Sequence, residues 1–180
     1  EVDDTMAKKI ILLRGVTPTG KNRIPKMSDL VEILEAVGFL SVKTYIQSGN
    51  IILNTDLSDE AIKRLVHDTI LKQLGADLSV IIKLPEQLTI AAQEDPFDAT
   101  YDASRIHLVF TNDDWSKETL ADLTETDFGD EAFVVGSECL YLYLPREAKK
   151  KRLNTNFLEK KLGIRATMRK LSVTSKLSEM

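Results

Sequence analysis

Residues 44–53 constrain the fold of this chain more than any other segment. They read TYIQSGNIIL, so apolar and polar residues alternate up to Ser48 and Gly49, and apolar residues resume after the glycine. This pattern is typical of a β-hairpin in which the glycine supplies the positive φ angle that a tight turn needs. The sequence therefore predicts two adjacent antiparallel strands here, and the segments on either side must complete the sheet.

The first part of the chain, residues 7–83, has the element order βαββαβ around this hairpin. A continuous apolar run predicts a central strand that ends at Arg14 and Gly15, because a strand buried on both faces needs apolar residues on both. Ser28 and Ser58 are suitable N-caps for two helices, whose apolar residues recur at helical spacing. The first strand, the two helices and a final β-branched strand are predicted at residues 10–13, 28–37, 58–74 and 78–83. This order predicts a ferredoxin-like unit.

The same element order recurs in residues 104–180, although no residue-level repeat accompanies it. The predicted strands are residues 106–111, 132–135, 140–144 and 166–171, and the predicted helices are residues 116–123 and 156–162. Between the two halves, residues 84–103 are predicted to form a short connecting helix, opened by Pro85, and an acidic loop. We therefore predict an α+β fold of two ferredoxin-like halves with antiparallel sheets, joined by a short helix and behaving as one compact unit.

Composition excludes several classes of protein. With 180 residues, of which 43% are hydrophobic, the chain has the composition of a globular protein. No apolar run approaches the roughly 18 residues of a membrane span. No secretory signal precedes Met6, and residues 1–5 are interpreted as a cloning remnant. Cys139 is the only cysteine, which excludes an internal disulfide and a cysteine-based zinc site. The resulting prediction is a cytoplasmic protein with no metal and no cofactor.

A candidate binding site follows from the strand order 4-1-3-2 that a ferredoxin-like unit predicts. In that order the first and second strands are parallel, so the end of the first strand and the tip of the hairpin lie at the same end of the sheet. The guanidinium of an arginine can donate two parallel hydrogen bonds to a carboxylate or phosphate, and side-chain amides can donate or accept hydrogen bonds. Glycines let a ligand approach the backbone N–H groups closely. The predicted ligand-binding residues at this end are Arg14, Gly15, Lys21, Asn22, Gln47, Ser48, Gly49 and Asn50.

The same residues also have a structural interpretation, which the pattern alone favours. Ser48 and Gly49 suit a turn, and Asn50 suits local hydrogen bonds to the backbone. Arg14 suits an ion pair with a nearby carboxylate. Both interpretations stay open at this point.

Four short motifs stand out: LLRG at residues 12–15, GKN at residues 20–22, TYIQSGN at residues 44–50 and FLEKKLG at residues 157–163. Together with Ala166, Thr167 and Arg169, they closely resemble the uncharacterised bacterial family called domain of unknown function 1697. The resemblance extends from Lys9 to Met180 and implies two ferredoxin-like halves in a small cytoplasmic protein, with no established activity, substrate or cofactor. Arg169 and Lys176 match the family pattern, so the resemblance adds them to the candidate ligand-binding residues.

A second candidate function is the binding of single-stranded nucleic acid. Along residues 140–144 the leucines face the helices, and the tyrosines face the other side of the sheet, where RNA-recognition modules stack bases. Residues 146–170 carry ten basic residues, whereas residues 94–131 carry twelve carboxylates. The residues of this alternative platform are Tyr45, Tyr141, Tyr143, Lys150, Lys151 and Arg152. Packing of the two open sheet faces against each other is the favoured structural alternative, because an open face exposes more apolar area than a monomer tolerates.

No group in the sequence is identified as catalytic. His107 alternates with apolar residues on a strand, His67 lies on the polar side of its helix, and neither belongs to a recognisable triad. Cys139 is predicted to be a partly buried, inert thiol. The sequence thus predicts a non-catalytic binding domain for a small anionic or nucleotide-like ligand. Its alternatives are a nucleic-acid-binding protein and an enzyme acting on a small substrate. No membrane partner is predicted, and the sequence does not indicate an oligomeric state.

Overall fold

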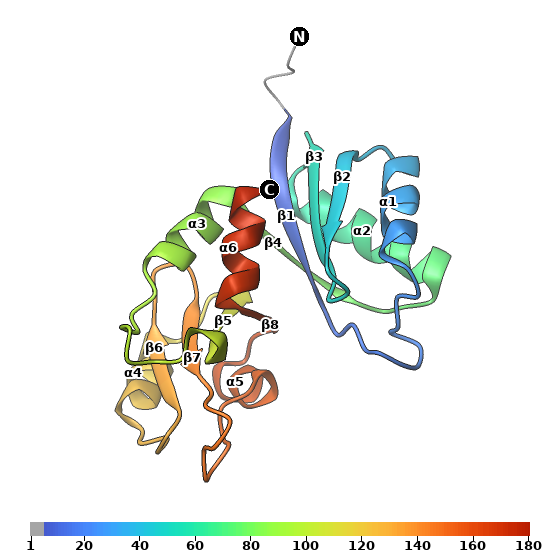
Figure 1. The fold of residues 1–180 in the computed structure, drawn as a ribbon. Coiled ribbons are helices and arrows are strands. Elements are labelled where there is room, and N and C mark those ends of the chain that lie inside the picture. Colours follow the sequence, from blue (N-terminus) through green and yellow to red (C-terminus); the bar gives the residue numbers. More distant parts are fainter. Residues whose placement is uncertain (1–5) are drawn as a thin grey trace. The chain divides into compact units, whose positions relative to one another are not determined.

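Residues 6–180 are described by a computed structural model of the chain (Figure 1). Their contacts divide the chain into two compact units: the first runs to Pro85 and includes Met180, and the second spans residues 86–179. Residues 1–5, interpreted above as a cloning remnant, lie outside the described residues. Among the residues that the structure describes, no helix combines the length and the apolar composition that crossing a membrane requires.

The first unit is a four-stranded sheet with two helices on one face (Figure 1). Its elements are β1 (Ala7–Arg14), α1 (Met27–Ala36), β2 (Leu40–Tyr45), β3 (Asn50–Thr55), α2 (Asp59–Leu74) and β4 (Ser79–Lys83). Every pair of neighbouring strands is antiparallel, and the strand order is β2-β3-β1-β4. This is the predicted order, so the ferredoxin-like arrangement of the first half is confirmed.

The apolar run in β1 supplies part of the core of the first unit. Side chains alternate between the two faces of a strand, so Ile11 and Leu13 lie on the same face. Ile11 and Leu13 belong to the core formed with α1 and α2, which includes Leu34 and Val66. The four consecutive residues of the run are each at most 1% exposed, namely Ile10, Ile11, Leu12 and Leu13.

The ends of α2 follow local sequence signals, whereas the start of α1 does not. The Ser58 hydroxyl accepts a hydrogen bond from a backbone N–H of the first turn, and Gly75 ends α2 with a φ of 75°, as predicted. The predicted N-cap at Ser28 is wrong. Because α1 begins at Met27, the extended Lys26 takes the N-cap position without a side-chain hydrogen bond, and Ser28 lies inside the first turn.

The second unit repeats this arrangement. Its elements are α3 (Pro85–Gln93), the 3-10 helix η1 (Ala103–Arg105), β5 (Ile106–Thr111), α4 (Lys117–Glu125), β6 (Ala132–Val135), β7 (Leu140–Tyr143), α5 (Thr155–Leu162), β8 (Ala166–Lys170) and α6 (Leu171–Glu179). Its strand order is β6-β7-β5-β8, again with antiparallel neighbours. Leu140 and Leu142 pack in one core with Leu120 of α4 and Leu158 of α5. The second βαββαβ half is therefore confirmed as well.

The C-terminal helix α6 is an element that the sequence did not predict. β8 ends at Lys170 and α6 begins at the next residue, so neither a turn nor a glycine separates them. α6 packs on β5 and β8, and its buried residues are Thr174 and Leu177. The missing turn signal explains why the chain was expected to end in a strand.

Candidate functional site

The structure places the end of β1 beside the tip of the hairpin, as the strand order predicts. Leu12 is paired with Asn50, and the backbone N–H of Leu13 donates a hydrogen bond to the carbonyl oxygen of Gly49 over 2.9 Å. Arg14 is the last residue of β1, so it lies at the same end of the sheet as the tip. The predicted juxtaposition is therefore present in the first unit.

The hairpin connection is longer than a two-residue turn and is closed by Asn50. The connection spans residues 46–49, with φ angles of 50° at Ile46 and 83° at Gly49. Asn50 is fully buried, and its Nδ2 donates to the carbonyl oxygen of Tyr45 over 3.0 Å and to the hydroxyl of Ser48 over 2.8 Å. Asn50 thus has the structural role that the turn interpretation expected.

Two other candidate amides also hold loops together. Gln47 Nε2 donates to the carbonyl oxygen of Ile24 over 2.6 Å. Asn22 Oδ1 accepts a hydrogen bond from the backbone N–H of Asp77 over 3.1 Å. An amide with a backbone partner has less hydrogen-bonding capacity left for a ligand. This end of the sheet is therefore a set of loops tied to one another.

The charged candidates differ widely in exposure. Lys21 and Lys176 are exposed, and Arg14 is half-buried. Arg169 is only 7% exposed, and its Nη1 donates to the Thr167 hydroxyl over 2.5 Å and to a backbone carbonyl over 3.0 Å. Burial lowers the pKa of Arg169 to about 10, so the side chain remains charged at neutral pH. A ligand role for these four residues stays a prediction.

Tyr141 is buried, which corrects the predicted nucleic-acid platform. Its side chain is 1% exposed, and its hydroxyl donates to the carbonyl oxygen of Ala91 in α3 over 2.6 Å. Desolvation raises the pKa of this hydroxyl, so it stays protonated and acts as a donor. Because α3 covers this side chain, Tyr141 offers no free ring face on which a base could stack.

Tyr143 is half-buried in a cluster of aromatic rings. Its ring centroid lies 5.8 Å from that of Phe97 and 4.8 Å from that of Tyr101, and its hydroxyl accepts the backbone N–H of Asp102 over 3.2 Å. Tyr45, in the first unit, is also half-buried. The Tyr143 ring therefore contributes to local packing within the second unit.

A hollow of about 570 Å³ in the second unit is formed by two loops. One loop, residues 126–131, connects α4 to β6, and the other, residues 144–154, connects β7 to α5. Lys150 and Arg152 of the predicted platform line this hollow, and Lys151 lies between them in sequence. We call it the basic hollow, and its lining residues are Asp127, Phe128, Gly129, Asp130, Lys149, Lys150 and Arg152.

Carboxylates of the first loop hold the second loop in place. Glu131 is 6% exposed, and its Oε1 accepts the backbone N–H groups of Arg152 over 2.7 Å and of Leu153 over 3.0 Å. Asp130 Oδ2 accepts the backbone N–H of Lys149 over 3.3 Å. These bonds fix the backbone that carries the cationic side chains, so a ligand would meet a largely preformed loop.

Arg152 is also held through its side chain. The central carbon of its guanidinium lies 5.1 Å from the ring centroid of Phe128, in a cation–π contact. Phe128 is 5% exposed, and the rings of Phe133 and Phe157 pack around it at centroid distances of 6.5 Å and 6.1 Å. The guanidinium therefore rests on a rigid aromatic wall.

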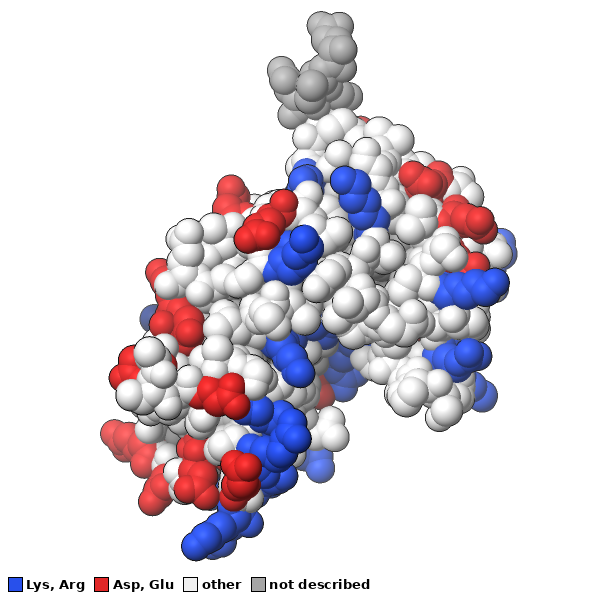
Figure 2. All heavy atoms as spheres, in the orientation of Figure 1, with Lys and Arg blue, Asp and Glu red and all other residues white. Residues whose placement is uncertain are grey.

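The cations of the basic hollow have no ionic partner within the described chain. No carboxylate of residues 6–180 forms an ion pair with Lys149, Lys150 or Arg152. The carboxylates of Asp127 and Asp130 line the same hollow, and each accepts one backbone N–H. Asp127 Oδ1 accepts the N–H of Gly129 over 2.8 Å. Figure 2 shows basic and acidic side chains side by side over this unit. The hollow thus combines unpaired cations with hydrogen-bond acceptors.

Phe128 and Glu131 are site residues that the sequence did not predict. Glu131 bonds backbone groups that are 21 and 22 positions further along the chain. The sequence Asp127-Phe128-Gly129 is a turn signal, and Gly129 does adopt a positive φ of 69°. That signal locates a turn, but it does not indicate which distant loop the turn contacts.

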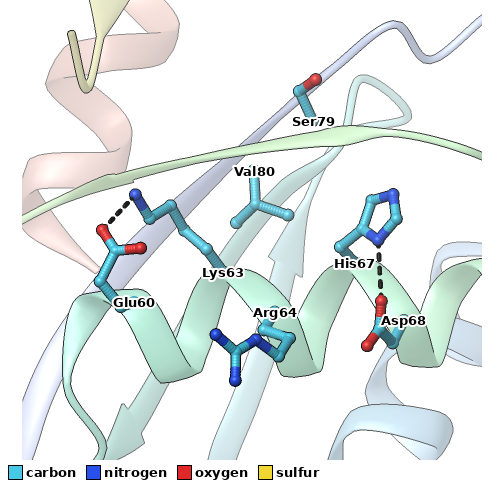
Figure 3. A pocket seen from close by; sticks show the side chains of 7 residues that line it. All are labelled: Glu60, Lys63, Arg64, His67, Asp68, Ser79 and Val80. Carbon is cyan, nitrogen blue, oxygen red and sulfur yellow. Dashed lines mark hydrogen bonds and ion pairs between the residues drawn. The ribbon is translucent and has the colours of Figure 1, made fainter.

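The first unit has a second hollow, of about 300 Å³, between α2 and β4 (Figure 3). Four of its charged or titratable side chains form two pairs: Lys63 Nζ lies 2.6 Å from Glu60 Oε1, and His67 Nδ1 lies 3.0 Å from Asp68 Oδ1. Arg64 also lines this hollow and belongs to neither pair. Ser79 of β4 points away from His67 in Figure 3, so these two residues do not form a nucleophile–base pair. This hollow is the weaker candidate, because it is smaller and has a single cation, Arg64, outside these pairs, whereas three cations with no ion pair among residues 6–180 line the basic hollow.

We expect His67 to titrate above its ordinary pKa of 6.5, because hydrogen bonds to Asp68 and Asp77, the latter over 2.7 Å, raise its pKa. Only an imidazolium can donate to both carboxylates. Since the folded-state pKa is raised, the stabilisation from His67 is complete below its unfolded pKa and is lost as the pH rises through the folded pKa. Proton NMR titration tests this, and Asp77→Asn should lower the His67 pKa.

His107 provides the internal control for that titration. Desolvation is the main cause that lowers its pKa below the ordinary 6.5, so the two histidines should titrate on opposite sides of that value. Asp77→Asn should leave His107 unchanged. A His67 pKa at or below 6.5 in the unaltered protein would contradict the predicted role of the two carboxylates.

Two ferredoxin-like units, one of them with a hollow lined by unpaired cations, define an α+β protein with a candidate anion-binding surface. The chain belongs to the family described as "Protein of unknown function (DUF1697)", whose model matches residues 6–141. The family that the sequence motifs indicated is thereby confirmed. The matched residues include the Asp127 side of the basic hollow and end before its basic side, residues 149–152.

Among solved structures, the chain is similar to the conserved bacterial protein SP0830 from Streptococcus pneumoniae. The two share 21% sequence identity with a TM-score of 0.73, over 97% of this chain and 98% of that chain. At this level of identity the similarity shows a shared fold. No curated protein matches this chain.

Proposed function

We propose that this protein is a non-catalytic binding protein for a small anionic ligand, which it holds in the basic hollow. One observation carries the proposal: Lys149, Lys150 and Arg152 line a single hollow and have no ion-pair partner among residues 6–180. A phosphate or carboxylate ligand would supply the missing negative charge, and its hydrogen bonds to the cations would be charge-assisted.

The size and the composition of the hollow favour a small ligand. Its volume, about 570 Å³, lies in the range of roughly 300–1,000 Å³ typical of small-molecule sites. Its lining has one apolar side chain, Phe128, and is otherwise mostly charged, which suits a charged ligand. The buried Tyr141 removes the main support for nucleic-acid binding.

The strand end of the first unit is the weaker location for such a ligand. Arg14 and Lys21 supply positive charge there, but the amides of Asn22, Gln47 and Asn50 have backbone partners. The predicted binding role of this end therefore stays a hypothesis, and its observed role is to connect the loops.

Isothermal titration with inorganic pyrophosphate at low ionic strength tests the proposal. We expect Arg152→Ala to weaken binding by about tenfold, because one charge-assisted contact contributes about 1.5–3 kcal/mol and part of it is screened at an exposed site. Arg146→Ala is the matched control: Arg146 is exposed on the same loop, does not line the basic hollow, and should leave the affinity within about twofold.

Three results would contradict the proposal. Unaltered protein that does not bind pyrophosphate would refute it directly. Equal weakening by the two arginine substitutions would indicate a general effect of net charge. Tighter binding to an oligothymidylate than to pyrophosphate, abolished in both variants, would favour the nucleic-acid alternative.

A further inference from the structure

We infer that the ligand of the basic hollow is a nucleotide, whose base stacks on the outer face of the Arg152 guanidinium. This inference rests on the proposed function and specifies its ligand. It derives from the position of Arg152 between an aromatic wall and the open hollow.

One side of the Arg152 guanidinium is already in contact with an aromatic ring. It lies over Phe128 at 5.1 Å, and Phe128 is itself fixed by Phe133 and Phe157. The backbone of Arg152 is fixed independently by the hydrogen bond from its N–H to Glu131 over 2.7 Å. Both ends of this long side chain are therefore restrained, which reduces the conformational entropy that binding would cost.

The outer face of the guanidinium is open to a planar group. Arg152 is exposed and lines the basic hollow, and no carboxylate of residues 6–180 forms an ion pair with it. A guanidinium is planar and delocalised, and nucleobases stack on such planes as they do on aromatic rings. A base here would complete a three-layer stack of base, guanidinium and Phe128.

The remaining groups of the hollow match the rest of a nucleotide. Lys149 and Lys150 are exposed cations on the same loop, suited to phosphate oxygens. Asp127 and Asp130 each accept one backbone N–H, and a carboxylate has about four acceptor sites. The free sites can accept hydrogen bonds from ribose hydroxyls. Inorganic phosphate offers few such donors, so the two aspartates favour a nucleotide.

The test compares adenosine 5′-monophosphate with ribose 5-phosphate, which has the same phosphate and sugar but no base. Isothermal titration of the unaltered protein should show adenosine 5′-monophosphate binding about tenfold more tightly, as stacking of one base predicts. Arg152→Lys keeps the positive charge and the backbone N–H but replaces the planar guanidinium with an ammonium group, on which a base cannot stack. In this variant the two ligands should bind equally, with ribose 5-phosphate within about threefold of its original affinity.

The outcomes separate this inference from the proposed function. If ribose 5-phosphate binds and adenosine 5′-monophosphate binds no better, the inference is wrong and the anion site stands. If neither ligand nor pyrophosphate binds, the proposed function is wrong as well. A tenfold preference that persists in Arg152→Lys would also overturn the inference, because the base would then be recognised elsewhere. Far-UV circular dichroism and Trp115 fluorescence verify that the variant is folded.

Discussion

Replacing Glu131 by alanine is expected to lower the free energy of unfolding of the second unit by about 2–4 kcal/mol. The carboxylate is almost fully buried and is the acceptor for the backbone N–H groups of Arg152 and Leu153. Alanine would leave both N–H groups without this partner, and the N–H of Leu153 is in a buried environment. Urea denaturation followed by the fluorescence of Trp115 measures the effect, because this only tryptophan packs against the core of the second unit.

Glu131→Gln is the matched control. Both N–H groups bond the same oxygen, Oε1, so a glutamine carbonyl can accept both. The bonds would then be neutral instead of charge-assisted and roughly half as strong, so we expect a loss of about 1–2 kcal/mol. Equal losses in the two variants, or a loss below about 1 kcal/mol for Glu131→Ala, would mean that these bonds do not hold the loop.

Gly49→Ala is expected to destabilise the first unit by about 2–4 kcal/mol. Gly49 has a φ of 83°, and a Cβ added there would lie 2.9 Å from Leu13 Cβ and 3.0 Å from Val16 Cγ2. The Leu13 Cβ is attached to the central strand and cannot turn aside. The clash would therefore push the tip away from β1 and weaken the hydrogen bond from Leu13 N–H to Gly49.

Gly20→Ala separates the clash from the backbone strain. Gly20 has a similar φ of 85°, but an added Cβ there would meet no atom within 4 Å. This variant should therefore lose only about 1 kcal/mol, the cost of a left-handed conformation for an L-residue. Urea denaturation followed by far-UV circular dichroism compares the two, and equal losses would show that the contact with Leu13 is unimportant.

The parts of the fold with a local physical cause were predictable from the sequence. Ser58, Gly75, Ser116 and Gly163 mark helix ends, because capping and left-handed termination depend on one residue and its immediate neighbours. The strand order followed from the βαββαβ pattern alone. α6 was not predicted, because β8 continues into it without a break. Its apolar spacing, at Val173 and Leu177, was the available signal.

The candidate site was predictable only in part, because its contacts join distant loops. Lys150 and Arg152 were predicted only as part of the nucleic-acid platform. That they share a hollow with Phe128 depends on two loops meeting in three dimensions, which periodicity and turn signals do not describe. At the end of β1 the sequence correctly predicted which segments meet, since the N–H of Leu13 bonds Gly49. It did not indicate that the amides of Gln47 and Asn50 would have backbone partners there.

The hydroxyl of Tyr141 has a consequence for the helix it contacts. Ala91 lies in the last turn of α3, where carbonyl groups lack partners within the helix, and the phenol donates to this carbonyl. α3 has no glycine in or directly after its last turn. Tyr141 of the sheet therefore satisfies a carbonyl group at this helix terminus, as a capping residue does in other helices. The position of the helix end thus depends on tertiary packing more than on the residues that follow it.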